Sequence, residues 1–231
     1  MKTMGLIGGM SWESSIEYYR IVNELTKARL GGFHSAKSLM ISVDFAEIEA
    51  LQQKGAWQEA GEVLSAAAKA LEMGGADFIV LCTNTMHNVA EAIQTSVNIP
   101  FLHIADATAA FIQSRGLYKV GLLGTRFTME QDFYKKRLMQ QHGLEVFIPD
   151  ETDRETIHRI IYGELVKGMI LSDSKALYLQ IIKKLQAMGA QGIILGCTEI
   201  GLLVQDGDCE LPLFDTTRIH AAAAVDFALM E

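Results

Sequence analysis

The chain has 231 residues, 49% of them hydrophobic, which is enough to bury one large core or two small ones. Its 28 acidic and 20 basic side chains give a formal net charge of −8 at pH 7, which argues against nucleic acid or anionic lipid as a partner. No apolar run approaches the roughly 20 residues that a membrane span needs, so we expect a cytoplasmic protein with no membrane partner.

Short apolar runs followed by helical patterns recur along the chain, as is typical of strands that feed helices in a parallel sheet. In chain order, the predicted strands cover Thr3–Ile7, Ser38–Val43, Phe78–Leu81, Val120–Leu123, Gly143–Ile148 and Gly192–Leu195. The predicted helices begin near Ser11, Trp57, Thr85, Thr128, Thr152, Asp173 and Thr217. The alternation of the two patterns predicts the α/β class.

An internal duplication organises these elements. Three pairs of segments match in the same order, at offsets of 116, 114 and 112 residues: Met4–Gly9 with Val120–Thr125, Gly75–Thr85 with Gly189–Glu199, and Ile99–Leu102 with Leu211–Phe214. The repeat predicts two pseudo-symmetric lobes, each a parallel-sheet α/β sandwich. The first lobe is expected to comprise residues 1–103 plus 215–231, and the second residues 104–214.

Ligands of open α/β sheets bind at the carboxyl ends of the strands, so the duplication predicts two matching half-sites. The second repeat pair aligns Cys197 with Thr83, and not with Cys82. Successive side chains of a strand point to opposite faces. We therefore expect Thr83 to face a cleft between the lobes and Cys82 to face away from it.

The three cysteines are too few, and odd in number, for a disulfide framework, which leaves reduced thiols. Cys197 follows a predicted strand at the turn into a helix. The helix N-terminus would favour the thiolate there and would offer N–H groups to a carboxylate. From its position alone, Cys197 could instead be a small buried packing residue, which is the usual role of a free cysteine.

Five ordered motifs span the chain: GLIGGMSWES at Gly5–Ser14, LCTNTMH at Leu81–His87, IPFLHIADAT at Ile99–Thr108, LLGTRFTM at Leu122–Met129 and GCTEIGLL at Gly196–Leu203. With these motifs the chain resembles the aspartate/glutamate racemase superfamily, in particular its aspartate racemase branch. The resemblance implies that two cysteines, one per lobe, face opposite sides of a substrate Cα in a cleft and move its proton without pyridoxal phosphate. It implies no cofactor, and a homodimer.

The first lobe departs from this family pattern. Cys197 matches the second-lobe cysteine, but where the family has Cys-Asn-Thr this chain reads Thr83-Asn84-Thr85. A threonine hydroxyl is a far weaker acid than a thiol. The resemblance therefore predicts that Cys197 deprotonates L-glutamate or L-aspartate, and that Thr83, or a water it positions, assists delivery of a proton to form the D-isomer.

Substrate-binding candidates follow the first and second predicted strands. The glycine turn that ends in Met10 and Ser11 could hold a carboxylate on its N–H groups, or could serve only as a helix cap. The resemblance favours substrate binding at both residues. Gln52 would by itself be a solvated helix residue, and only its family position makes it a substrate contact.

Further candidates lie at the other strand ends. Asn84 and Thr85 could donate to the α-carboxylate or act as ordinary caps, and Thr125, the repeat partner of Gly9, is expected to line the same cleft. Thr198 is a substrate-binding candidate beside the thiol. Glu199 could bind the substrate ammonium or orient a proton path, although an acid in a first helical turn is also favourable without any such role.

Other functional classes fit the sequence less well. The Gly5–Gly9 stretch lacks GxGxxG, which argues against dinucleotide binding, and no CxxC, HExxH or similar spacing predicts a metal site. Two alternatives stay open. One is another cofactor-free enzyme of the superfamily, such as a hydantoin racemase, malonate decarboxylase or maleate isomerase; the other is an amino-acid-binding sensor without catalysis. The preference between aspartate, glutamate and other amino acids is open as well.

Overall fold

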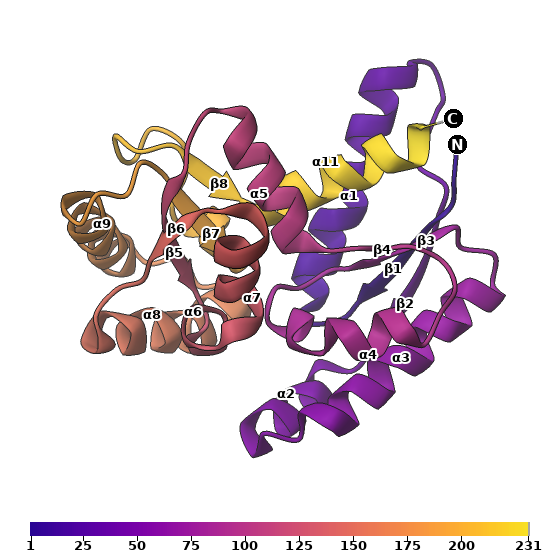
Figure 1. Ribbon diagram of the computed structural model, residues 1–231, viewed down its shortest axis with the longest axis horizontal. Helices are drawn as coiled ribbons and strands as arrows, with labels where there is room; N and C mark the ends of the chain where they lie inside the picture. The colour runs from indigo at the N-terminus through magenta and orange to yellow at the C-terminus, as the bar shows by residue number, and fades with distance from the viewer. Residues whose placement is uncertain (231) are drawn as a thin grey trace. The chain divides into compact units, whose positions relative to one another are not determined.

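The structure is a computed structural model that describes residues 1–230 (Figure 1). The chain divides into two compact units. Unit 1 is Met1–Ile104 together with the segment from His220 onward, and unit 2 is Ala105–Ile219. The sequence places the lobe boundaries after residues 103 and 214, and the second boundary between the compact units lies five residues further on, inside a helix.

Each unit contains one four-stranded parallel sheet. In unit 1 the strands are β1 (Met4–Gly8), β2 (Ser38–Ser42), β3 (Phe78–Leu81) and β4 (Phe101–Leu102), in the order β2-β1-β3-β4. In unit 2 they are β5 (Lys119–Gly124), β6 (Glu145–Phe147), β7 (Ile193–Gly196) and β8 (Leu213–Asp215), in the order β6-β5-β7-β8. The same order occurs twice, which confirms the predicted α/β class and agrees with the duplication.

Helices flank both sheets. Those of unit 1 are α1 (Trp12–Leu30), α2 (Phe45–Lys54), α3 (Trp57–Met73), the 3-10 turn η1 (Thr85–Val89), α4 (Ala90–Thr95) and most of α11 (Thr216–Leu229). Those of unit 2 are α5 (Ile104–Ser114), α6 (Arg126–Glu130), α7 (Asp132–Lys136), the π-helical η2 (Arg137–Gln141), α8 (Glu151–Gly163), the 3-10 turn η3 (Leu165–Lys167), α9 (Ser172–Ala187) and α10 (Ile200–Leu203). Within residues 1–230, none of these helices combines the length and the apolar character that a membrane crossing requires.

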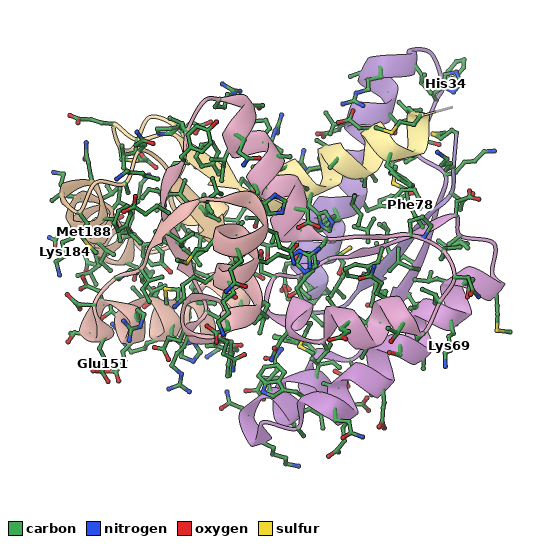
Figure 2. The ribbon with its side chains drawn as sticks, viewed as in Figure 1. His34, Lys69, Phe78, Glu151, Lys184 and Met188 are labelled. Carbon is green, nitrogen blue, oxygen red and sulfur yellow. The ribbon has the colours of Figure 1, made fainter. Side chains whose placement is uncertain are left out.

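The two faces of the unit 1 sheet pack against different helices, because side chains alternate along its strands. Met4, Leu6, Phe78 and Val80 belong to a core with α1 and α11. The neighbouring strand residues, such as Ile79, belong to a second core with α2, α3 and α4. Phe78, labelled in Figure 2, contacts the ring of Phe227 in α11 at 4.8 Å between centroids. Lys69 marks the exposed outer side of α3 in the same view.

Two helix starts differ from the sequence prediction. The helix expected near Thr85 begins as a 3-10 turn and becomes α-helical only at Ala90. The helix expected near Thr128 begins at Arg126, because the Thr125 hydroxyl accepts the backbone N–H of Thr128 at 3.2 Å and caps it. Both differences lie at strand ends, where the turns are built around candidate site residues.

Candidate functional site

Serine side chains make the hydrogen bonds that hold the turn after β1 in its conformation. Ser11 caps α1 by accepting the N–H of Ser14 at 3.4 Å. The N–H of Gly9 donates to the Ser15 hydroxyl at 2.7 Å, and that hydroxyl donates to the Ser11 carbonyl at 3.0 Å. The Gly9 amide is thus already bonded within the turn. The carboxylate cradle that the glycine turn suggested does not include this amide.

Gly9 has its conformation for a steric reason. Its φ is +95°, and a Cβ at this position would lie 2.1 Å from the Val43 carbonyl oxygen. Only glycine allows this close approach of the turn to the end of β2. The Met10 and Ser11 side chains that follow are both buried, and the peptide bond between them is cis.

The turn after β3 lies beside the turn after β1. The Ser14 hydroxyl donates to the Cys82 carbonyl at 3.2 Å, and the Cys82 N–H donates to the Ile7 carbonyl at 2.9 Å. The Thr83 N–H then turns back to the Leu81 carbonyl at 2.9 Å. The structure therefore brings together Met10 and Ser11 with Thr83, Asn84 and Thr85 at one edge of the unit 1 sheet.

Cys82 is separated from this edge. Its side chain is fully buried in the core with Tyr18 and Val80, on the face of the sheet covered by α1 and α11, as the alternation along β3 predicts. Burial raises the pKa of its thiol well above the ordinary value. Cys82 is a packing residue, whereas Thr83 is 9% exposed at the strand end.

Gln52 is not the solvated helix residue that its sequence context suggests. It lies on the inner side of α2 with 4% of its surface exposed, and its amide nitrogen approaches the Met86 sulfur at 2.9 Å. Met86 follows Thr85 directly. Gln52 therefore packs against the same turn that carries Thr83, a placement that the helix pattern alone did not predict.

In unit 2, the turn after β7 holds a thiol and a carboxylate side by side. The Cys197 thiol donates to Oε2 of Glu199 at 3.0 Å, and the Thr198 hydroxyl donates to the same oxygen at 2.6 Å. Glu199 is 4% exposed, while Cys197 and Thr198 are partly exposed. A carboxylate this close to a thiol is placed to exchange a proton with it.

The protonation of Cys197 differs from the sequence expectation. Burial of the thiol raises its pKa well above the ordinary value, and the charge and hydrogen bond of Glu199 raise it further, against a smaller effect of the backbone N–H groups of Thr198 and Glu199. The expected helix field is weak here, because α10 has only four residues. The resting residue is a thiol that donates to a carboxylate.

Two glycines let the ends of β5 and β7 meet closely. Gly124 and Gly196 are register partners, and a Cβ on Gly196 would lie 2.8 Å from the Leu123 carbonyl oxygen. Thr125 follows Gly124 directly and is buried, with its hydroxyl 3.2 Å from that of Thr128. Thr125 and Cys197 therefore leave neighbouring strands at the same edge of the unit 2 sheet.

Tyr178 is a residue that sequence reasoning missed. It lies fully buried on α9, and burial raises the pKa of its hydroxyl, with additional contributions from Cys197, Glu164 and Glu199. Nothing in the local sequence of α9 separates Tyr178 from an ordinary core residue. No group of three or more His, Cys, Asp or Glu side chains in residues 1–230 is arranged to hold a metal ion.

The comparison with known families decides the affiliation of the chain. The model of the family described as "Asp/Glu/Hydantoin racemase" matches residues 7–224. The chain belongs to this family. Because the family consists of racemases, which are isomerases, the chain is an enzyme of the isomerase class.

The chain is similar to solved structures and to a named relative of this racemase family. A crystal structure of a candidate Asp/Glu racemase from Yersinia pestis is 59% identical with a TM-score of 0.94, and 100% of each chain is covered. An aspartate racemase homologue from Pyrococcus horikoshii is 37% identical with a TM-score of 0.87, again with 100% of each chain covered. The broad specificity amino-acid racemase RacX of Bacillus subtilis (strain 168) is 28% identical over 67% of this chain and 66% of that protein.

Two further polar residues of this racemase-family chain lie away from the strand-end turns. Lys167 is exposed at the end of η3, before Gly168, whose φ is +72°. Cys209 lies partly exposed in the loop before β8, and its thiol is 3.3 Å from the Leu211 carbonyl oxygen. Neither is joined to the Cys197–Glu199 pair by a hydrogen bond that the structure shows.

Proposed function

We propose that the chain is an amino-acid racemase that converts L-glutamate or L-aspartate to the D-enantiomer without pyridoxal phosphate. The observation that carries the proposal is the Cys197–Glu199 pair at the end of β7, together with Thr83 at the corresponding position of the repeat. The proposal takes each unit to supply one half-site for the same substrate. The names of the relatives support this class of substrate.

In the proposed reaction, the proton of the Cys197 thiol passes to Glu199, and the resulting thiolate removes the Cα proton from the L-face. The Cα–H bond breaks, an S–H bond forms, and the electron pair is delocalised into the α-carboxylate. On the other face, an O–H bond of Thr83, or of a water that it positions, breaks as the new Cα–H bond forms. Glu199 then releases its extra proton to solvent, and Thr83 or the water takes up one proton from solvent, which restores the two half-sites.

Besides Thr83, eight residues are proposed to bind the substrate in this arrangement. The α-carboxylate would be held by donors at the strand ends, and the ammonium group by Glu199. The proposed set is Met10, Ser11, Gln52, Asn84, Thr85, Thr125, Thr198 and Glu199, of which Thr198 and Glu199 adjoin the thiol and the other six contact the remaining parts of the substrate. The kcat/KM values for aspartate and for glutamate measure which side-chain carboxylate the proposed site prefers.

The test follows Cα proton exchange and enantiomer composition in deuterated water. Wild type, Cys197→Ser, Thr83→Ala and Cys82→Ala are each incubated with L- and D-glutamate and with L- and D-aspartate. We expect Cys197→Ser to abolish exchange, and Thr83→Ala to lower racemisation by about 10²-fold or more, the usual contribution of a positioned acid or base. Cys82→Ala is expected to stay within about threefold of wild type, because Cys82 only packs the core.

Each other outcome identifies a different error. Wild type that binds these amino acids without exchanging either enantiomer is a sensor or acts on another substrate class, such as hydantoins or malonates. A dead Cys82→Ala variant that is still folded would mean that the repeat alignment is wrong by one residue. A homodimer and a cytoplasmic location are predictions from the sequence, and sedimentation velocity tests the first.

A further inference from the structure

His87 connects the turn of Thr83 to the start of α5. Its Nδ1 lies 2.7 Å from the Thr83 carbonyl oxygen, and its Nε2 lies 3.2 Å from the backbone nitrogen of Ile104, the first residue of α5. The residue is 2% exposed. Its ring packs against those of Phe101 and His103, at 5.6 and 4.5 Å between centroids, so it has no room to rotate freely.

The two partners fix which nitrogen of the ring carries the proton. A carbonyl oxygen only accepts a hydrogen bond, so Nδ1 carries the hydrogen that it donates to Thr83. A backbone N–H only donates, so Nε2 is the unprotonated acceptor for Ile104. Protonation of Nε2 would place two donors against each other. The ring is therefore held in one neutral tautomer by the backbone on both sides.

The Thr83 peptide is restrained from both of its ends as a result. Its N–H is bonded to the Leu81 carbonyl at 2.9 Å, and its carbonyl is bonded to His87. With both groups fixed, the backbone dihedrals of Thr83 are set, and the direction of its Cα–Cβ bond with them. Because the His87 ring is neutral, it restrains the Thr83 backbone without adding a formal charge to this turn.

We propose that His87 is a positioning residue that aims the Thr83 hydroxyl for proton delivery to the D-face of the substrate, through its bond to the Thr83 carbonyl. The inference rests on the proposed racemase function. It assigns different tasks to the two ring nitrogens. The Nδ1–H bond serves the reaction, whereas the Nε2 bond to Ile104 only holds the ring in place.

The two tasks separate in a pair of substitutions. In His87→Asn the amide N–H takes the place of Nδ1–H and keeps the bond to Thr83, while the bond to Ile104 is lost. In His87→Gln the side-chain oxygen takes the place of Nε2 and keeps the bond to Ile104, while the bond to Thr83 is lost. The measurement is the ratio of Cα exchange with retained configuration to racemisation, starting from the L-enantiomer in deuterated water.

This ratio reports on the D-face alone. Cys197 still opens the Cα–H bond in both variants, and a carbanion that receives no proton from the Thr83 side returns to the L-isomer with solvent deuterium. We expect His87→Gln to raise the ratio about 10-fold to 100-fold, the cost of a misplaced catalytic group. His87→Asn should keep the ratio within about twofold of wild type, even if both of its rates fall.

His220→Gln is the matched control for loss of a buried histidine in the same unit. His220 is fully buried, and it bonds the Tyr18 hydroxyl at 2.8 Å and the Leu102 carbonyl at 2.9 Å. Its ring lies 6.0 Å from that of His87 between centroids, so the control keeps the hydrogen bonds of His87 but changes one of its ring neighbours. Substitution of His220 should lower the melting temperature without changing the ratio. In the Thr83→Ala background, His87→Gln should not raise the ratio further.

The outcomes distinguish the two proposals. If wild type racemises and a folded His87→Gln variant shows an unchanged ratio, the role of His87 is overturned and the racemase function is not. If His87→Gln does not fold, a raised ratio in His87→Asn overturns the assignment to Nδ1, and an unchanged ratio supports it. Wild type that exchanges no Cα proton overturns the function, and the inference about His87 with it.

Discussion

At the scale of single residues, the proposed removal of the Cα proton depends on two side chains in contact, those of Cys197 and Glu199. The Cys197 thiol donates to Glu199 at 3.0 Å, and burial, together with the charge and hydrogen bond of this carboxylate, raises the pKa of the thiol. The negative charge of the pair can lie on sulfur or on oxygen. In the proposed reaction the pair is at rest when the charge lies on oxygen, and it is ready to remove a proton when the charge lies on sulfur.

Replacement of Glu199 should therefore separate its effect on the pKa of Cys197 from its proposed role as the acceptor of the thiol proton. In Glu199→Gln the negative charge is lost, so the pKa of Cys197 falls and the thiolate forms at lower pH. Racemisation should nevertheless fall by about 10²-fold, because the partner that receives the thiol proton is gone. The check is the pH dependence of iodoacetamide alkylation beside the racemisation rate.

The alkylation experiment needs a background without other reactive thiols. Cys209→Ser removes the partly exposed loop cysteine, and Cys82 is fully buried. In that background, faster alkylation of Glu199→Gln than of the parent near pH 8 is the expected result. Equal alkylation profiles would show that the Glu199 carboxylate does not control the thiol.

The sequence predicted which residues lie at the strand ends better than it predicted the protonation or burial of their side chains. The repeat aligned Thr83 with Cys197, and the alternation of the strand placed Cys82 in the core, because both follow from periodicity. The protonation of Cys197 depends on a side-chain contact with Glu199 that periodicity does not specify. The burial of Gln52 similarly depends on the packing of α2 against Met86, which lies 34 residues away.

At the scale of elements, the turn between β1 and α1 depends on the absence of a side chain at Gly8. A Cβ there would lie 2.6 Å from the Ser15 hydroxyl, which accepts the Gly9 N–H. The sequence contains the serines that close this turn, but their bonds follow from the angle at which α1 leaves the strand. For this reason the sequence alone does not decide between a carboxylate cradle and a helix cap at this turn.

Substitution of Gly8 by alanine is expected to destabilise the protein by about 1–3 kcal/mol, through overpacking and the lost bond of a buried N–H group. Gly163→Ala is the matched control. Gly163 ends α8 with nothing within 4 Å of an added Cβ, so its substitution should be neutral or stabilise by up to about 1 kcal/mol. Urea unfolding of the two variants measures the difference, and equal effects would contradict the steric account.

A second contact between elements joins α5 to the π-helical segment η2. Arg137 donates to both carboxylate oxygens of Asp106 at 2.6 and 2.7 Å, and His142 lies 2.8 Å from one of them. Burial by itself would raise the pKa of Asp106, but these hydrogen bonds outweigh it, and the pKa lies below its ordinary value. The ionised carboxylate is therefore favoured by folding.

This depressed pKa has a defined sign in the pH dependence of stability. The contribution of Asp106 is fully present above the unfolded-state pKa of about 3.9, and is lost as the pH falls through the lower folded-state value. Asp106→Asn should therefore be less stable than wild type at pH 6, and the difference should shrink as the pH falls below about 4. Chemical unfolding at a series of pH values measures it, and a difference that does not depend on pH would contradict the account.

At the scale of the whole molecule, the duplication predicted most of the fold. Three matched segments were sufficient to expect two parallel-sheet lobes, and the strand order is the same in both units. Helix α2 and the short strands β4 and β8 were the least visible in the sequence. Two- and three-residue strands leave almost no periodic signal, and they form because a neighbouring strand is already in place.

A racemase built from unlike half-sites must still satisfy the equal free energies of its substrate and product. We expect kcat and KM to differ between the L- and D-enantiomers, because the proposed reaction uses a thiol for one side of Cα and a hydroxyl for the other. The ratio kcat/KM must be the same in both directions, and circular dichroism of the amino acid over full time courses measures it. Unequal kcat/KM values would show that another reaction removes the product.

The position of α11 has a consequence for how the protein is made. Ala221, Ala224, Val225 and Ala228 of this helix complete the core that holds Met4, Leu6 and Phe78, near the other end of the chain. A ribosome releases the chain from its N-terminus, so the first sheet emerges early, but α1 alone covers this face of it until α11 has been synthesised. Unit 2 lies between, with all of its strands already synthesised. Unit 1 thus completes its core only after unit 2 has been synthesised. Nascent chains that stall before α11 should leave part of an apolar sheet face accessible to chaperones and proteases.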